Sequence, residues 1–318
     1  MKKQLKKSLI LGLILILTVN SLAGCDWKTV LGTEQSKTEA SSATTPSKTT
    51  ASNENQAPAM NTLAFELSAD QSYYIVTGIG TYQNAALVIP ATYREKPVRA
   101  IREFAFANCE SITSLTVSNG ITRIEESAFY NCKNLQSVTL PSTIEKIEKN
   151  TFRKCQKLVS VTIPNGIHTI GRFAFAACGS LESITLPESI LRIEDFAFQF
   201  NSRMTEFVFP PNLSYLGDSV FAGCAALTSV SIPSGITSIG KGTFDSCTFT
   251  SITIPSHITS IGICALRNYH LESVIFENPD GWSAGDTSLT RRDLSDPAVA
   301  AELLGRTYNE MEWVRQDP

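Results

Sequence analysis

Histidine is scarce in this 318-residue sequence, and the residue patterns of common enzymes are missing from it. No Gly-x-Ser-x-Gly elbow, phosphate-binding glycine loop or His-Glu-x-x-His motif occurs. The three histidines, His168, His257 and His270, stand at different positions of an internal repeat, so no two of them stack as paired metal ligands. These absences argue against an enzyme, a cofactor and a metal centre.

The chain also lacks a basic stripe. Its formal net charge is −3, and the four lysines of the N-terminal leader, residues 1–24, contribute to it; without them the charge changes from −3 to −7. Nucleic acids are bound through clustered Lys and Arg, so the mildly acidic chain is not expected to bind nucleic acid. Its surface charge is not expected to hold it on an anionic membrane either.

The leader has the pattern of an export signal. Four lysines lie between positions 2 and 7, an apolar stretch runs from Leu9 to Val19, and Asn20 interrupts it. A helix that crosses a bilayer needs about 20 apolar residues, so this shorter run favours a cleaved signal peptide over residues 1–24. The sequence Leu-Ala-Gly-Cys that ends it resembles the lipobox of bacterial lipoproteins, which implies a lipid on Cys25. An ordinary signal peptide or an uncleaved anchor remains the alternative.

A polar segment follows the leader. Residues 32–60 are rich in Ser, Thr, Ala, Gln, Asn and Glu and contain no aromatic residue. Such a segment buries too little apolar surface to offset its ordering entropy, so we predict a lipidated N-terminus and disordered tether over residues 25–60. As a flexible coil the tether would span roughly 30 Å.

Phenylalanine recurs in a strict step of 23 residues. Around it each unit repeats Ile-x-x-x-Ala-Phe-x-x-Cys-x-x-Leu-x-x-Val-x-Ile-Pro-x-x-Ile, as the unit from Ile124 to Ile144 illustrates. Leu266 takes the place of the phenylalanine in the last unit, one residue early. The phenylalanines in phase are Phe106, Phe129, Phe152, Phe175, Phe198, Phe221 and Phe244.

Each unit predicts one short strand followed by a turn. Val138 and Leu140 alternate with Ser137 and Thr139, and Pro141 ends the strand because proline cannot donate to a ladder. One unit cannot bury all its apolar side chains, whereas stacked units cover one another. The fold class predicted is therefore a repeat solenoid with a parallel β-sheet on one face, which eight units would extend over roughly 35–40 Å.

The unit resembles the BspA-type leucine-rich repeats of bacterial surface proteins, over residues 98–277. The stretch before it, with Tyr73-Tyr74-Ile75-Val76 and Lys96-Pro97-Val98, is similar to the entry segment of that family, so residues 61–97 are expected to form an N-terminal cap. Terminal repeats need a cover. Residues 278–318 are expected to form a C-terminal cap, with a short helix over residues 298–304.

Cysteine follows the same step. Neighbouring units would place these residues about 5 Å apart, so disulfides such as Cys109–Cys132 remain possible in an exported protein. Side chains in a parallel stack point the same way, which fits disulfide torsions badly, and we favour free thiols that fill an identical buried slot. In the irregular unit Asn201 replaces the cysteine. The cysteines in phase are Cys109, Cys132, Cys155, Cys178, Cys224 and Cys247.

The outward positions of the strands form the candidate binding face. Hydroxyl side chains are good sheet formers, so a purely structural role for these columns stays open. The unit around Asn201 is the exception, because Glu206 and Val208 replace the hydroxyls there. One column contains Thr116, Thr139, Thr162, Thr185, Val208, Ser231 and Thr253, and its neighbour contains Ser137, Ser160, Ser183, Glu206 and Ser229.

Two functions are compatible with these features. The first is a monomeric, lipid-anchored binding protein displayed outside the cytoplasm, for which the resemblance implies adhesion to proteins of a host, including its extracellular matrix, or of neighbouring cells. The alternative is a structural or assembly lipoprotein of the bacterial envelope that binds a partner from the same cell. No cofactor, metal or nucleic acid is expected in either case.

Overall fold

The computed structural model describes residues 62–316. The predicted signal peptide, the lipid anchor at Cys25 and the tether lie outside the described residues. Within residues 62–316 no helix is both long enough and apolar enough to cross a membrane.

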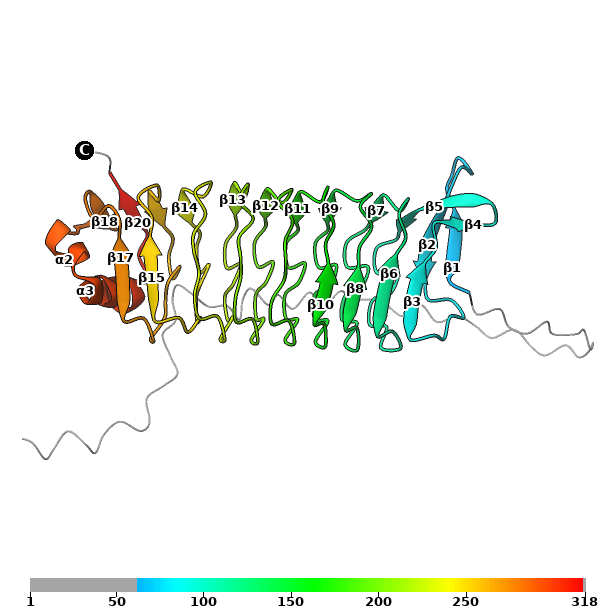
Figure 1. The fold of residues 1–318 in the computed structure, drawn as a ribbon, viewed down its shortest axis with the longest axis horizontal. Coiled ribbons are helices and arrows are strands. Elements are labelled where there is room, and N and C mark those ends of the chain that lie inside the picture. The colour runs from blue at the N-terminus through cyan, green and yellow to red at the C-terminus, as the bar shows by residue number, and fades with distance from the viewer. Residues whose placement is uncertain (1–61, 317–318) are drawn as a thin grey trace, which may run out of the picture. The chain divides into compact units, whose positions relative to one another are not determined.

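The described chain winds into stacked turns, and each turn passes through two sheets (Figure 1). Strands of the first sheet pair in parallel without a register shift, so that Ser137 lies between Ser114 and Ser160. The predicted parallel solenoid is confirmed. The strands of the first sheet are β3 (Ala86–Ile89), β6 (Ser114–Val117), β8 (Ser137–Thr139), β10 (Ser160–Thr162), β15 (Ser251–Ile254) and β17 (Ser273–Phe276).

The second sheet is made of strands of mostly two residues, each with its isoleucine or leucine buried. Parallel pairing joins β5 to β7, then β9 to β11, β12 and β13, then β14 to β16. These strands are β5 (Lys96–Ile101), β7 (Arg123–Ile124), β9 (Lys146–Ile147), β11 (Thr169–Ile170), β12 (Arg192–Ile193), β13 (Tyr215–Leu216), β14 (Ser238–Ile239) and β16 (Ser260–Ile261).

The repeated phenylalanines form one column of stacked rings in the core. The centroids of Phe106 and Phe129 are 5.1 Å apart, and those of Phe198 and Phe221 are 5.8 Å apart. Neighbouring planes deviate by at most 12°, the angle between Phe152 and Phe175. Each ring is at most 1% exposed. Burial of this size stabilises the fold by several kcal/mol per ring, because truncation of a buried Phe to Ala costs about 3–5 kcal/mol.

Two sharp corners flank the phenylalanine in each turn. The residues two before and two after it take positive φ angles near 60°, as in Phe173 (57°) and Ala177 (58°). Left-handed backbone is unfavourable for residues with a Cβ, yet glycine occupies only some of these corners, at Gly223 and Gly242. Interstrand packing and hydrogen bonds between turns therefore hold most corners in a conformation that the local sequence does not favour.

The first sheet is interrupted, which corrects the expectation of one sheet through all units. The segments 183–186, 206–209 and 229–232 contain no paired strand, although their side chains still alternate between buried and exposed. Phe207 and Phe209 take inward places that hold Val, Ile or Leu elsewhere. The Phe207 centroid lies 5.2 Å from Phe198 and 4.6 Å from Phe221, so the extra rings of this unit pack into the core beneath the interrupted stretch.

Antiparallel strands adjoin the first turns. Strand β1 (Ala64–Leu67) pairs antiparallel with β2 (Tyr74–Gly78), whereas β2 pairs in parallel with β5. Strand β4 (Thr92–Tyr93) pairs with the start of β5, where the rings of Phe65 and Tyr93 stack at 3.9 Å.

The C-terminal segment adds antiparallel strands to the second sheet and helices against β17. Strand β20 (Trp313–Arg315) pairs with β16 and with β18 (Trp282–Ala284), which pairs with β19 (Thr287–Ser288). The predicted short helix is present as α3 (Pro297–Glu302), continued by a π-helical turn, Leu303–Thr307, and preceded by α2 (Arg291–Ser295) (Figure 1). Trp282 and Trp313 are both buried, with their rings beside Phe276.

Candidate functional site

The candidate binding face is the outer surface of the first sheet. Parallel register places Thr116, Thr139 and Thr162 in one row across β6, β8 and β10, with all three hydroxyl side chains exposed. Thr253 is exposed on β15. The predicted residues Ser137 and Ser160 are aligned with each other on β8 and β10. Six other predicted residues also point outward but lie in the interrupted segments, where no ladder aligns them; these are Thr185, Val208, Ser231, Ser183, Glu206 and Ser229.

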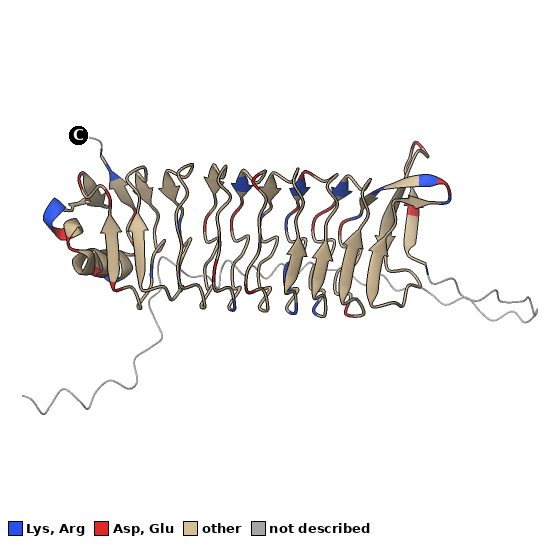
Figure 2. Cartoon of the chain, viewed as in Figure 1, with Lys and Arg blue, Asp and Glu red and all other residues tan. Residues whose placement is uncertain are grey.

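Charge is almost absent from this face. The strands of the first sheet contain no Lys, Arg, Asp or Glu, whereas Arg and Lys mark several strands of the second sheet (Figure 2). Glu206 is the one charged residue among the predicted face residues, and beside it Val208 is 76% exposed. A surface of hydroxyls with an exposed aliphatic side chain can donate and accept hydrogen bonds and still be desolvated at low cost.

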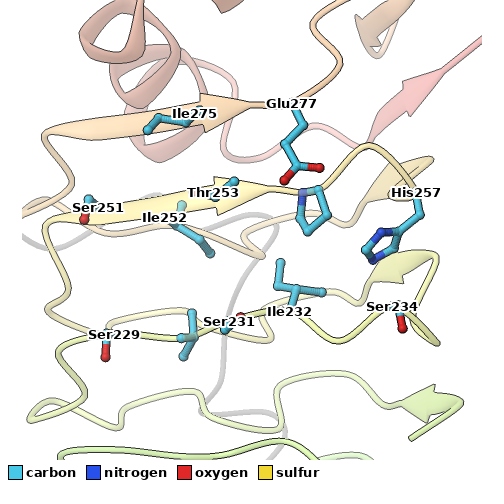
Figure 3. Close-up of a pocket in the computed structure, with 12 residues that line it drawn as sticks. Ser229, Ser231, Ile232, Ser234, Ser251, Ile252, Thr253, His257, Ile275 and Glu277 are labelled. Atoms are coloured by element: carbon cyan, nitrogen blue, oxygen red, sulfur yellow. The ribbon is translucent and has the colours of Figure 1, made fainter. Parts of the chain in front are cut away.

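The interruptions of the first sheet open two grooves. The larger has a volume of about 460 Å³ and lies between the segment 229–232 and β15. Ser229 and Ser231 lie on one side of it and Ser251 and Thr253 on the other (Figure 3). The smaller groove, of about 270 Å³, lies between residues 183–186 and 206–211.

Two ionisable residues stand at one end of the larger groove (Figure 3), but both are engaged in local contacts. The Nε2 atom of His257 lies 3.2 Å from the carbonyl oxygen of Pro233. The Glu277 carboxylate accepts the backbone N–H of Ser256 at 2.9 Å. The arrangement provides hydrogen-bonding groups around an open groove, and it does not pair a nucleophile with a base.

Sequence reasoning did not find these grooves. The sequence signal is the pair Phe207 and Phe209, which stand where other units have Val, Ile or Leu. Phe209 lines the smaller groove, and neither phenylalanine lines the larger one.

The repeats described above match the model of a known protein family. Residues 87–203 and 192–281 match the BspA type leucine rich repeat region, in six copies. These residues make up more than half of the chain. The chain belongs to the BspA-type leucine-rich repeat family.

Solved structures similar to this BspA-type protein are leucine-rich repeat proteins of other bacteria. The T. pallidum leucine rich repeat protein is 26% identical with a TM-score of 0.54, and the match covers 59% of this chain and 88% of that one. A leucine-rich repeat protein from Bacteroides ovatus is 24% identical with a TM-score of 0.57, and the match covers 68% of this chain and 64% of that one. This chain therefore spans less than two thirds of the B. ovatus protein. No curated protein matches the chain.

The cysteine slot of the BspA-type repeat holds free thiols, as predicted. The Sγ atoms of five of these cysteines donate to the carbonyl of the phenylalanine in the preceding turn, as Cys132 does to Phe106 at 3.1 Å and Cys224 to Phe198 at 3.3 Å. The Sγ of Cys109 lies 3.2 Å from the hydroxyl of Ser111 instead. Burial raises the pKa of Cys178 and of Cys224 to about 12. These thiols are packing groups whose hydrogen bonds join successive turns, and among residues 62–316 no cluster of His, Cys, Asp or Glu is arranged to hold a metal.

Proposed function

We propose that this BspA-type protein is a cell-surface lipoprotein whose first-sheet face binds proteins, in adhesion to a host or to neighbouring cells. The observation that carries the proposal is the hydroxyl-rich face, which has Glu206 as the one charged residue among its predicted positions, with its two grooves. Leucine-rich repeat proteins generally bind proteins, and members of this family are typically exposed at the surface. Both properties support the proposal.

The face suits a protein partner better than a small molecule. Protein interfaces combine an apolar centre with a hydrogen-bonding rim and bury about 800 Å² on each side. Val208 supplies an apolar centre, and the rows of Ser and Thr on either side of it supply donors and acceptors. The open grooves of the first sheet would admit side chains of a partner rather than enclose a substrate.

The lipid anchor, the tether and the two end segments of the proposed architecture would hold this face in a position to bind a partner. Lipid on Cys25 would retain the protein at the bacterial membrane, and the tether over residues 25–60 would hold the repeats away from it. Residues 61–97 and 278–318 would cover the ends of the apolar stack, which otherwise expose a hydrophobic turn to water. The repeats are proposed to act as a monomer.

Pull-down with the purified protein tests the binding face. Retention of extracellular-matrix or host-surface proteins is expected, and retention of envelope components instead would favour the alternative assembly role. The variant Thr139→Glu/Thr162→Glu/Thr185→Glu should abolish retention, because three carboxylates on this face would have to be desolvated.

A matched control places three carboxylates on the other sheet. Ser214, Thr237 and Thr259 are exposed, share one position of the repeat beside the second sheet, and become Glu in the control. Retention should persist in this control. If the face variant still retains the same proteins, the first-sheet face is not the binding surface.

The anchor is tested separately. Cys25→Ala should release the protein into the soluble fraction, because the cysteine is the acceptor of the lipid in the proposed site. Unchanged membrane retention would contradict the lipoprotein assignment without affecting the binding face.

A further inference from the structure

Two asparagines of the chain are followed directly by glycine, and the repeat places both pairs in the same kind of turn. The first pair, Asn119-Gly120, follows β6, and the second pair, Asn165-Gly166, follows β10. Both asparagines are exposed, and φ is 103° at Gly120 and 104° at Gly166. The two pairs are therefore matched in glycine conformation and in exposure.

The glycine nitrogens of the two pairs also have equivalent surroundings. The N–H of Gly120 donates to the hydroxyl of Thr143 at 3.2 Å, and the N–H of Gly166 donates to the hydroxyl of Ser189 at 3.2 Å. In each case the hydroxyl belongs to the next turn of the solenoid. A difference in reactivity between the two pairs must therefore arise at the asparagines and in the turns that contain them.

The side chains of the two asparagines are held differently. The Oδ1 atom of Asn119 accepts the backbone N–H of Ser142 at 3.0 Å and lies 3.2 Å from the hydroxyl of the same serine. Beside Asn165 the next turn has Glu188 in place of that serine, and a carboxylate cannot donate. Within residues 62–316 the side chain of Asn165 makes no hydrogen bond. Its amide is therefore not held by the next turn.

The turn of the second pair is also open. In the turn of the first pair the N–H of Ile121 donates to the carbonyl of Ser118 at 3.4 Å. No such bond joins Ile167 to Pro164, the equivalent residues of the second turn, in the part of the chain that the structure describes. Asn165 can therefore change rotamer freely, whereas the amide of the first pair must break two hydrogen bonds to do so.

We propose that Asn165 is a modification site, at which the asparagine converts spontaneously to aspartate and isoaspartate because no neighbouring turn holds its amide. Asn119 is preserved because Ser142 holds it. Glycine in the following position assists the reaction, because it has no Cβ to crowd the attacking nitrogen. The modification does not depend on the first-sheet face, so either proposal can fail without the other.

The reaction needs only water. The nitrogen of Gly166 attacks the Cγ atom of Asn165, and the side-chain nitrogen leaves as ammonia with the proton of the Gly166 N–H. The product is a succinimide ring, which water then opens. Cleavage of the bond between the ring nitrogen and Cγ gives aspartate, and cleavage of the bond to the main-chain carbonyl carbon gives isoaspartate. No electrons are transferred in either step.

Conversion adds a negative charge at the end of β10. The new carboxylate and that of Glu188 would occupy the same position of successive turns, about 4.8 Å apart, and would repel each other. Isoaspartate also lengthens the backbone of the turn by one carbon atom. The bond from Gly166 to Ser189 would then be displaced. The modification would therefore loosen the contact between this turn and the next one.

Peptide mapping by mass spectrometry tests the proposal on the full chain, incubated at mildly alkaline pH. Trypsin should release residues 158–172, in which Asn165 is the only asparagine, and residues 103–123, which contain Asn119. Asn165 should convert about tenfold faster than Asn119, since two hydrogen bonds raise the barrier at Asn119. In urea, where neither side chain is held, the two pairs should convert at similar rates.

Variants of the next turn test the cause of the difference. Glu188→Ser supplies the serine that holds the amide of the first pair, so it should slow the conversion of Asn165 several-fold. Ser142→Glu should speed the conversion of Asn119. Glu188→Ala is the matched control, because it removes the carboxylate without adding a hydroxyl, and it should leave the rate at Asn165 close to that of the unmodified chain. Circular dichroism checks that every variant is folded.

Three outcomes would overturn the proposal: equal rates at Asn165 and Asn119 in the folded chain, conversion of Asn165 in urea but not in the folded chain, and equal rates at Asn165 in Glu188→Ser and Glu188→Ala. Equal rates in the folded chain would mean that the Asn-Gly sequence alone sets the rate. Conversion in urea only would mean that the fold protects both pairs. Equal rates in the two variants would mean that a serine in the next turn does not hold the amide.

Discussion

The side-chain carbonyl of Asn201 accepts the backbone N–H of Cys178, the residue at the same position of the preceding turn, at 2.8 Å. In regular turns this N–H donates instead to the phenylalanine three residues earlier, as Cys155 does to Phe152 at 3.2 Å. Asn201 is fully buried, and its Nδ2 has no hydrogen-bond partner in the described chain. One substitution in the cysteine slot has therefore changed a hydrogen bond between turns and buried an unsatisfied donor.

Asn201→Cys should stabilise the protein. It removes the buried unsatisfied amide, which costs about 1–3 kcal/mol, and restores the thiol of the regular slot. We expect the free energy of unfolding in urea to rise by about 1–2 kcal/mol. Asn268 stands in the same slot of the last unit, but its amide donates to Phe249 at 2.6 Å and accepts from His270 at 2.8 Å. Asn268→Cys should therefore lower stability, and a gain in both variants would contradict this explanation.

Ala177→Gly and Gly223→Ala should act in opposite directions at equivalent corners. Both residues have positive φ, and in a left-handed corner an alanine Cβ costs about 1 kcal/mol relative to glycine. Ala177→Gly should raise the free energy of unfolding by about 0.5–1 kcal/mol. A Cβ at Gly223 would lie 2.4 Å from the Phe200 ring, so Gly223→Ala should cost about 1–3 kcal/mol. Destabilisation by Ala177→Gly would show that the corner carries no strain.

Backbone amides in the interrupted segments should exchange with solvent faster than those of β8 and β10. Residues 183–186, 206–209 and 229–232 lack the ladder that protects paired strands. Hydrogen exchange followed by mass spectrometry measures the difference. Phe207→Val/Phe209→Leu, which restores the residues of regular units, should slow exchange in residues 206–209. Exchange rates unaffected by that variant would mean that the two rings do not cause the interruption.

Alkaline pH should destabilise the protein through its buried thiols. The pKa of Cys178 and of Cys224 is raised from 9.0 to about 12 by burial, so the unfolded chain releases these protons first as pH rises. Each of these protonated thiols therefore contributes stability that is fully present below about pH 9. Above that pH the contribution of each thiol falls by about 1.4 kcal/mol per pH unit, until about pH 12. Cys224→Ala should be less stable at about pH 8 but lose less stability between about pH 8 and about pH 10.5, in urea unfolding. Equal losses of stability in Cys224→Ala and in the unmodified chain would contradict the raised pKa of the Cys224 thiol.

The sequence by itself determined the solenoid, its step of 23 residues, the phenylalanine column and the buried cysteine slot, because a periodic pattern of apolar residues leaves stacking as the only way to bury them. Only the tertiary structure decided where the first sheet is interrupted, which corners are left-handed, and that the amide of Asn201 lacks a partner. These features depend on volumes and hydrogen bonds between neighbouring turns. A residue such as Phe207 looks permissible in its own unit, and its effect appears only when Phe198 and Phe221 are packed against it.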